Sequence, residues 1–409
     1  MKVSCLQENL ARGLSVAGRA ISARSALPIL SHILFTTDEG RLRLSSTNLE
    51  MGIHCWIGGR VEEDGAIAVP ARTVIDLVNA FPPDRVDLRQ EVRTMTLNVR
   101  CGRSEANIKG LDAVDFPPIP TPEEGAADGI FIDPETLRTA ISQVAFAAAT
   151  DEARPTLTGV LLRWEATAAG PTLTLAAADG YRLAVRRTPL PEGEVERLIT
   201  NVPEGRLNPS VIVPARTMVE WARICGELAK GRDERPLVRI TFTPDGNRIM
   251  FQAQTSPDAP VPMEVVLVSQ LIPGTFPDYQ QLIPRDRNTR LITGTAELLK
   301  ACQTAHIFAR ENTNTLLFHI HPGSDLEPGR LVVSATSAET GSDVTELDAA
   351  IEGTAVEIAF NVKFILDVLG VVNSPQVMMD IISPSSPGVI RPVGGDDFTY
   401  VVMPMTLER

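Results

Sequence analysis

The sequence of 409 residues lacks the features that mark several large classes of protein. Aromatic residues make up 5% of it, and no apolar run is long enough to cross a bilayer. Residues 1–8 lack the apolar segment of a signal peptide, so we expect a cytoplasmic protein that does not enter a membrane. The five cysteines form no CxxC pair, which favours reduced, buried thiols over disulfides or a zinc site.

Recognisable catalytic motifs are also missing. The sequence contains no GxGxxG, GxxxxGK[ST], GxSxG or HExxH pattern. His319 and His321 stand two residues apart on a predicted strand, but no third metal ligand is near them, so packed or exposed histidines are the simpler interpretation. Asp179-Gly180 is typical of a turn. We therefore predict that the protein is not an enzyme and that it holds no metal and no cofactor.

What the sequence does contain is an internal repeat. The chain is too long for one hydrophobic core, so several domains are expected. Three amphipathic patterns have apolar residues at helical spacing, which predicts three helices with one buried stripe each. The stripes are Leu10, Leu14, Ala17 and Ile21; Leu137, Ile141, Val144 and Ala148; and Leu298, Cys302, Ala305 and Phe308.

Each helical pattern is followed by an alternating strand, typical of a half-buried antiparallel sheet. The three strands are 41–45, 172–176 and 330–334. A small polar residue, Asn48, Asp179 or Ser337, stands four positions beyond the last apolar residue of each. A second helix is predicted in each copy, opened by Pro70-Ala71-Arg72-Thr73, Pro214-Ala215-Arg216-Thr217 and Asn361-Val362-Lys363-Phe364.

The repeat predicts an α+β protein of three similar domains, each with two helices packed on antiparallel sheets. A stretch rich in Pro, Gly and Glu at 117–129 is a good linker, and a second boundary falls near 273–284. We expect domains at 1–122, 123–272 and 273–409.

The charge pattern has two interpretations. A net charge of −13 argues against binding of nucleic acid by the body of the protein. The six predicted helices, however, carry more basic than acidic residues, which suits loose contact with phosphates. Solvated helix faces with ion pairs three or four residues apart explain the same pattern, and on charge alone that interpretation is favoured.

Seven stretches, in their order and spacing, resemble one known family. They are Leu27-Pro28-Ile29-Leu30, Thr47-Asn48-Leu49-Glu50-Met51, Val69-Pro70-Ala71-Arg72, Asp179-Gly180-Tyr181-Arg182-Leu183-Ala184-Val185, Phe276-Pro277-Asp278-Tyr279, Phe360-Asn361-Val362 and Tyr400-Val401-Val402-Met403-Pro404-Met405. Together with the threefold repeat, they make the sequence similar, over essentially its whole length, to the bacterial DNA polymerase III β subunits, the DNA sliding clamps.

The resemblance implies a processivity factor of the replicative polymerase. In this family two chains pair head to tail, and their six domains form a ring whose helices line a hole for duplex DNA of any sequence. The partners implied are the replicative polymerase subunit, the clamp loader and other proteins that carry a clamp-binding peptide. The rival hypothesis is a monomeric three-domain adaptor that grips peptides without encircling DNA.

The resemblance also implies site residues. The family's DNA contacts fall on Arg24, Arg72 and the stretch 151–156, where Arg154 is basic. We add Arg216, because it occupies the same repeat position as Arg72. The departures from the family in this stretch are Asp151, Pro155 and Thr156.

In the family, short peptides bind in a groove between the second and third domains. The matching positions are Leu157, Gly180, Tyr181, Arg182, Leu183, Pro277, Leu282, Val401, Met403, Pro404 and Met405. Leu, Val and Met near a chain end are typical of an adaptable apolar groove, and the alternative is that 403–405 fill a core. Thr406 replaces an arginine that is common in the family. For the ring interface, the resemblance points to the edge strand with Ala106 and Ile108 in one chain, and to Ile307 and Phe308 in the other.

Overall fold

The structure is a computed structural model, and it describes residues 1–21, 27–122, 129–167, 170–191, 210–228, 237–255, 261–311, 313–324, 327–395 and 397–406. Helices and strands in this part of the chain fall into three modules of the same plan. The helices of the first module are α1 (Gln7–Ala17) and α2 (Ala71–Ala80). Its strands are β1 (Lys2–Leu6), β2 (His32–Asp38), β3 (Arg41–Thr47), β4 (Met51–Ile57), β5 (Arg60–Glu63), β6 (Ala66–Pro70), β7 (Arg85–Glu91), β8 (Thr96–Cys101) and β9 (Ser104–Lys109).

The second and third modules repeat this order. The second has helices α3 (Pro134–Val144) and α5 (Ala215–Leu228) and strands β10 (Ile130–Ile132), β11 (Gly159–Thr167), β12 (Gly170–Ala178), β13 (Arg182–Pro189), β14 (Ser210–Pro214), β15 (Val238–Phe242), β16 (Arg248–Gln254) and β17 (Met263–Gln270). The third has helices α6 (Thr295–Ala309) and α7 (Val362–Leu369) and strands β18 (Thr289–Gly294), β19 (Thr315–His321), β20 (Arg330–Ser337), β21 (Gly341–Asp348), β22 (Ala350–Gly353), β23 (Val356–Asn361), β24 (Gln376–Ile381), β25 (Gly388–Pro392) and β26 (Phe398–Val402).

The six predicted helices and the three alternating strands are confirmed. Two of the apolar stripes run past the end of their helix: Ile21 lies beyond α1 and Ala148 beyond α3, because short 3-10 turns follow both helices. The small polar residues after the alternating strands also have a common role. Asn48, Asp179 and Ser337 each accept hydrogen bonds from the backbone N–H groups two and three residues ahead, which holds the turn into the next strand.

The sheets continue from one module into the next. In the first junction, between the first and second modules, β17 pairs antiparallel with β4. In the second junction, between the second and third modules, β26 pairs antiparallel with β13. The resulting sheets have the orders β10-β15-β16-β17-β4-β3-β2-β6 and β14-β11-β12-β13-β26-β25-β24-β18-β22. The remaining sheets, β5-β1-β7-β8-β9 and β21-β20-β19-β23, lie at the two ends of the chain's arrangement.

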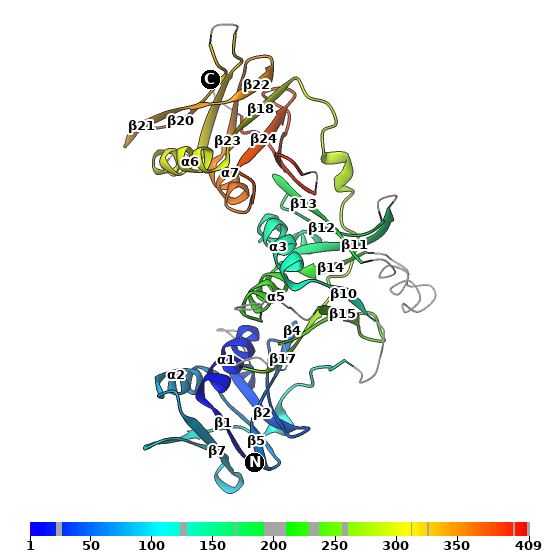
Figure 1. Ribbon diagram of the computed structural model, residues 1–409, viewed down its shortest axis with the longest axis vertical. Coiled ribbons are helices and arrows are strands. Elements are labelled where there is room, and N and C mark those ends of the chain that lie inside the picture. Colours follow the sequence, from blue (N-terminus) through cyan, green and yellow to red (C-terminus); the bar gives the residue numbers. More distant parts are fainter. Residues whose placement is uncertain are drawn as a thin grey trace.

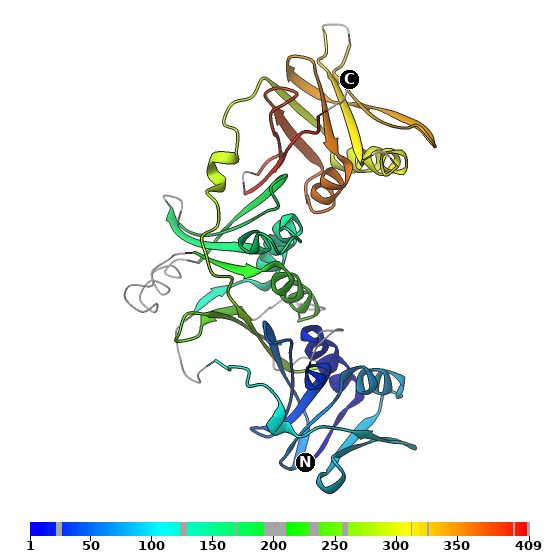
Figure 2. The ribbon, with the colours of Figure 1, turned by 180° about the vertical axis from the view of Figure 1, so that it is seen from behind.

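The three modules form a crescent. Figure 1 shows the helices α6, α7, α3, α5, α1 and α2 following one another along its concave side, with the sheets behind them. The view from the back agrees (Figure 2). The helical faces that do not pack on the sheets therefore point toward a common region of space.

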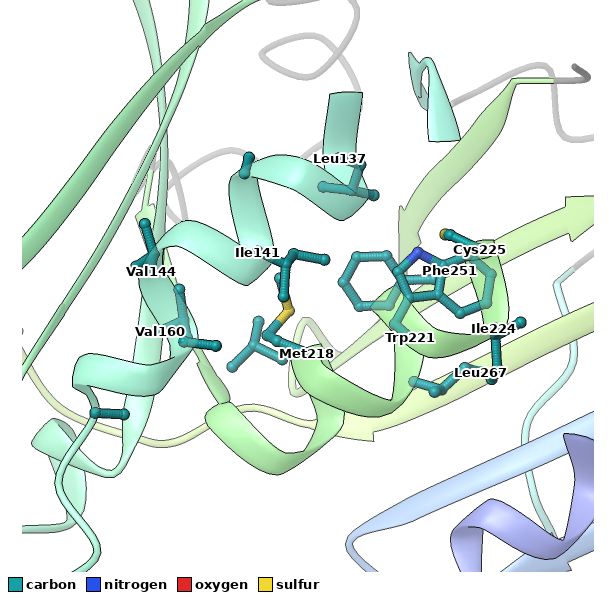
Figure 3. Packing of buried hydrophobic residues seen from close by; sticks show 14 of the residues in the cluster. Leu137, Ile141, Val144, Val160, Met218, Trp221, Ile224, Cys225, Phe251 and Leu267 are labelled. Atoms are coloured by element: carbon teal, nitrogen blue, oxygen red, sulfur yellow. The ribbon is translucent and has the colours of Figure 1, made fainter. Parts of the chain in front are cut away.

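Within each module the two helices pack on each other over the sheet. Figure 3 shows this core in the second module, where Ile141 of α3 faces Met218 and Trp221 of α5. All three are fully buried, and the Trp221 ring stacks on Phe251 of β16 with 5.4 Å between centroids. No helix within the described ranges is long and apolar enough to span a membrane.

Candidate functional site

The turn between β12 and β13 is built by the Asp179-Gly180 pair, as predicted. The Asp179 Oδ1 accepts hydrogen bonds from the N–H groups of Tyr181 (2.9 Å) and Arg182 (3.0 Å). Gly180 has a φ of 95°, in the left-handed region that glycine adopts without strain. The turn exposes the Tyr181 side chain, while the Arg182 side chain turns into the second junction.

Apolar residues of this turn, of the β13–β26 pair and of two 3-10 turns packed near it make up what we call the II–III surface: Leu157, Tyr181, Leu183, Leu282, Val401 and Met403. Leu183 and Val401 are opposite each other in the β13–β26 pair and are buried. Tyr181, Leu282 and Met403 are 64%, 54% and 43% exposed. Clustered apolar side chains with this much exposure are typical of a protein interaction site.

The chain end runs along this surface. The N–H of Met403 donates to the carbonyl of Tyr181 (2.8 Å), and the N–H of Met405 donates to the carbonyl of Ala359 (2.8 Å). Because Met403 keeps 43% of its surface exposed, the segment does not simply fill a core. Pro404 and Met405 are half-buried, and Pro277 and Thr406 are exposed.

The Arg182 side chain joins the second and third modules. Its guanidinium donates to the carboxylates of Asp179 (3.0 Å) and Asp367 (2.5 Å) and to the carbonyl of Phe146 (2.9 Å). It also stacks over the ring of Phe364, 4.5 Å from the centroid. Arg182 is thus part of the support beneath the II–III surface.

Arg154 lies beside the same turn. Its Nη2 donates to the carbonyl of Asp179 (3.0 Å), and a β-carbon added to Gly180 would lie 2.8 Å from its Nη1. Asp151 caps the following loop by accepting from the N–H of Ala153 (2.9 Å). The departures Pro155 and Thr156 belong to the short 3-10 turn that ends at Leu157. The structure therefore brings Arg154 next to the II–III surface.

The concave face carries exposed basic residues on the helices. Arg72 and Arg216 each occupy the second position of their helices, α2 and α5. The Arg72 side chain is 96% exposed and 3.9 Å from Asp76, and Arg216 is also exposed. Lys300 and Lys363 are exposed on α6 and α7. Arg24 lies outside the described residues.

Two basic residues counted on the helices are used inside the first junction instead. Arg19 pairs with Glu220 (3.1 Å) and with Glu227, and Arg12 donates to the Glu227 carbonyl (3.1 Å). Sequence analysis missed this pairing. The seven-residue spacing of Arg12 and Arg19, and of Glu220 and Glu227, was the available signal, because it puts each pair on one helix face.

The sheet at each end of the crescent has edge strands in the part of the chain that the structure describes. β9, with Ala106 and Ile108, is the edge of one end sheet, and β21 is the edge of the other. Ile108 is buried and Ala106 half-buried. Near β21, at the end of α6, Ile307 is exposed and Phe308 half-buried. The predicted interface residues thus lie at opposite ends of the chain's arrangement.

Other groups offer little chemistry. Within the described residues no set of three potential metal ligands comes together; His319 instead lies 3.2 Å from Glu357 and its ring is parallel to that of His321. The five cysteines are buried free thiols, as expected, and burial raises the pKa of Cys5 and Cys302 to about 12. A cavity of about 790 Å³ opens between the start of α6 and β22, and none of the residues that line it belongs to the II–III surface.

Comparison with family models divides the chain into three matches. Residues 1–120, 131–278 and 280–406 match the N-terminal, central and C-terminal domains of the DNA polymerase III beta subunit. Together they account for nearly all of the sequence.

Individual relatives are similar along their full length. The beta sliding clamp of Synechococcus elongatus is 30% identical over 411 residues, covering 100% of both chains. The beta sliding clamp of Bacillus subtilis is 28% identical over 415 residues, covering 99% of both.

Solved structures give the same result. The B. subtilis DNA polymerase sliding clamp has a TM-score of 0.84 at 26% identity, and the Caulobacter crescentus beta sliding clamp has 0.83 at 28%, each with 100% of both chains covered. In the latter structure, polyethylene glycol is bound at a region described as the beta-motif tethering region.

Proposed function

This chain belongs to the DNA polymerase III beta subunits, the beta sliding clamps, and we propose that two copies close head to tail into a ring around duplex DNA. As a member of this family it is a non-catalytic processivity factor of the polymerase holoenzyme. The observation that carries the ring is the rule of strand pairing at the two internal junctions.

That rule is the same in both places. The last strand of one module, β17 or β26, pairs antiparallel with the fourth strand of the preceding module, β4 or β13. Among the described residues, two strands of these types are paired on one side and have an open edge on the other: β9, the last strand of the first module, and β21, the fourth strand of the third. Pairing β9 of one copy with β21 of the other therefore extends an existing pattern and closes a ring of six modules.

The register follows from the same rule. The positions are matched by following the paired residues from the first strand of each module outward to its last strand. Asn107 of β9 then corresponds to Val268 of β17 and Val401 of β26. In the same way, Ser342 of β21 corresponds to Gly52 of β4 and Leu183 of β13. Asn107 of one copy then lies opposite Ser342 of the other. By the same count Arg103, in the turn just before β9, comes opposite Glu346 of β21, and opposite charges at such a position stabilise the pair.

The helices supply a second part of the interface. The first helix of one module contacts the second helix of the next. Arg12 of α1 donates to the Glu227 carbonyl of α5 (3.1 Å), and the side-chain amide of Gln143 of α3 donates to the carbonyl of Val371, just after α7 (3.2 Å). By this rule α6 of one copy meets α2 of the other. Ile307 and Phe308, at the end of α6, would be covered by that contact.

Duplex DNA is the proposed occupant of the hole. Arg24, Arg72, Arg154 and Arg216 are our candidates for contact with phosphates. Exposed, flexible cations bind phosphates weakly and without regard to sequence, so they allow the ring to slide. Retention would come from the closed ring and not from the strength of any contact.

The II–III surface is the proposed groove for partner peptides, from the polymerase subunit, the clamp loader and other clamp-binding proteins. Its apolar side chains, among them the flexible Met403, accommodate varied apolar ligands. The full set proposed for this groove is Leu157, Gly180, Tyr181, Arg182, Leu183, Pro277, Leu282, Val401, Met403, Pro404 and Met405. We further propose domain limits at 1–122, 123–272 and 273–409, and a cytoplasmic location.

Cysteine cross-linking tests the ring. Asn107→Cys with Ser342→Cys should form a disulfide between chains, because directly opposite residues in a strand pair lie about 5 Å apart. Asn107→Cys with Glu346→Cys is the matched control, since the second cysteine is displaced along the strand by about 13 Å. The native cysteines are buried and should not interfere.

DNA retention tests the topology. The oxidised Asn107→Cys/Ser342→Cys ring, closed on nicked circular DNA by a clamp loader, should stay bound until the circle is cut and then slide off. Equal retention on circular and linear DNA, or a protein that sediments as a monomer at micromolar concentration, would support the monomeric adaptor instead. Deleting residues 403–409 should abolish peptide binding and leave the dimer intact.

A further inference from the structure

The first junction has the same strand pairing and backbone hydrogen bonds as the second junction, where the II–III surface lies. Seven residues of the proposed peptide groove have structural counterparts at the first junction. In order along the chain, Leu30, Leu49, Glu50, Gly52, Pro117, Val268 and Gln270 correspond to Leu157, Gly180, Tyr181, Leu183, Pro277, Val401 and Met403. Val268 pairs with Gly52 as Val401 pairs with Leu183. The N–H of Gln270 donates to the Glu50 carbonyl at 2.8 Å, the same bond as that from Met403 to Tyr181.

The turn geometry agrees as well. Leu49 has a φ of 79°, the left-handed conformation that its counterpart Gly180 adopts at 95°. A non-glycine residue rarely takes this conformation, so the two turns share an unusual backbone. Phe116 and Phe276, which lead into the two linkers, are both buried and both followed by proline.

The two junctions differ at one position, where the first has Gly52 and the second has Leu183, and another residue of the chain fills the space beside Gly52. A β-carbon added to Gly52 would lie 2.6 Å from Cγ2 of Ile119, so the Ile119 side chain takes the volume that the Leu183 side chain occupies in the second junction. Ile119 packs on the cluster that contains Val268 and Trp56. Its carbonyl lies 3.3 Å from Nε2 of His54, and a cavity of about 60 Å³ remains beside it.

We propose that the linker 117–119 occupies, as an internal ligand, the first-junction counterpart of the partner site, and that this occupation limits each chain to one peptide-binding site. The ligand that this first-junction site fits is an extended peptide with a branched aliphatic side chain. Because the linker is covalently attached, its effective concentration exceeds that of any peptide in solution. The comparison rests on the proposed groove at the II–III surface, but the occupation of the first junction is measured separately.

The second linker is arranged differently. Tyr279, three residues after Phe276 as Ile119 is three after Phe116, is buried in a 3-10 turn, Tyr279–Leu282, capped by the Asp278 side chain. This turn leaves Tyr181 and Met403 exposed. In the first junction their counterparts are the polar Glu50 and Gln270, so an emptied site there would bind apolar peptides more weakly than the II–III surface.

The experiment uses a fluorescein-labelled peptide with the sequence of residues 114–122 and the full-length dimer carrying Met403→Glu, which disables the II–III surface. Fluorescence anisotropy should show no saturable binding to this protein. With Ile119→Gly added, binding should become saturable with a dissociation constant of about 1 mM or tighter. Adding Gly52→Leu as well should abolish it, because the leucine side chain refills the emptied space.

Three results would overturn the inference: saturable binding at the first junction before Ile119 is changed, no binding to a folded Ile119→Gly dimer, or binding that survives Gly52→Leu. Circular dichroism and sedimentation confirm that each variant is a folded dimer. If Ile119→Gly does not fold, Ile119→Ala is used with the same criteria. Failure of the proposed groove would appear separately, as partner peptides that do not bind protein with Met403 intact.

Discussion

Replacing Arg182 by methionine should loosen the second junction without disturbing the first. The guanidinium side chain is 11% exposed and is paired with Asp179 and Asp367, which are 16% and 43% exposed. Breaking a buried ion pair costs about 3–5 kcal/mol, but Asp367 is solvated enough to regain water. We therefore expect a cost of about 2–3 kcal/mol for separating β13 from β26, with methionine retaining the packing on Phe364.

Hydrogen exchange measures this cost locally. Amides of 182–189 and 398–402 should exchange roughly 30- to 150-fold faster in Arg182→Met, because each 1.36 kcal/mol is a factor of ten. Amides of β4 and β17 should be unchanged and serve as the internal control. Asp367→Asn should have a smaller effect, and the double variant should cost less than the sum of the two changes. Exchange within twofold of the unchanged protein at the second junction, or equal acceleration at both junctions, would refute the role assigned to Arg182.

Further predictions concern pH, core packing and DNA. Burial, with the nearby charge of Arg43, lowers the pKa of His54 to about 4 from an ordinary 6.5, so its contribution to stability is complete above pH 6.5 and is lost as the pH falls toward 4. His54→Gln should remove about 2.5 kcal/mol of the difference in unfolding free energy between pH 7 and 4.5; an unchanged pH dependence in urea titrations would contradict this. Trp221→Ala should cost about 3–5 kcal/mol, seen as a lower urea midpoint, and a loss below 1 kcal/mol would mean that its stack on Phe251 is not well packed. Arg72→Ala and Arg216→Ala should each reduce the salt dependence of binding to linear DNA, by about 0.9 in slope for each phosphate that is no longer neutralised, while retention on closed circles stays the same.

The fold could be predicted from local pattern because the spacing of apolar residues within each helix and strand indicates which of its sides is buried. Leu137, Ile141 and Val144 are apolar at helical intervals, and all three are buried in the structure. Asn48 and Asp179 stand out in the sequence by their position alone, and the structure supplies the cause, since both hold the same turn.

What joins the modules could not be predicted from such patterns. The pairing of β17 with β4 links residues more than 200 positions apart, and no local spacing encodes it. Arg19 has the pattern of a surface cation; its spacing from Arg12 places both on one helix face, but the fold identifies their partners on α5. Ile119 fills the space beside Gly52 because glycine has no side chain, and a search of the sequence for functional groups does not detect such an absence.

Continuous sheets across both junctions make the connecting peptides mechanically redundant. A protease that cut the chain between the first and second modules would leave them bound by the backbone ladder of β4 and β17 and by the Arg19 ion pairs. The fragments should therefore copurify under native conditions and separate only in denaturant. A force that opens the proposed ring would then separate it where the strand pair joins two different chains, because no peptide connects the modules there.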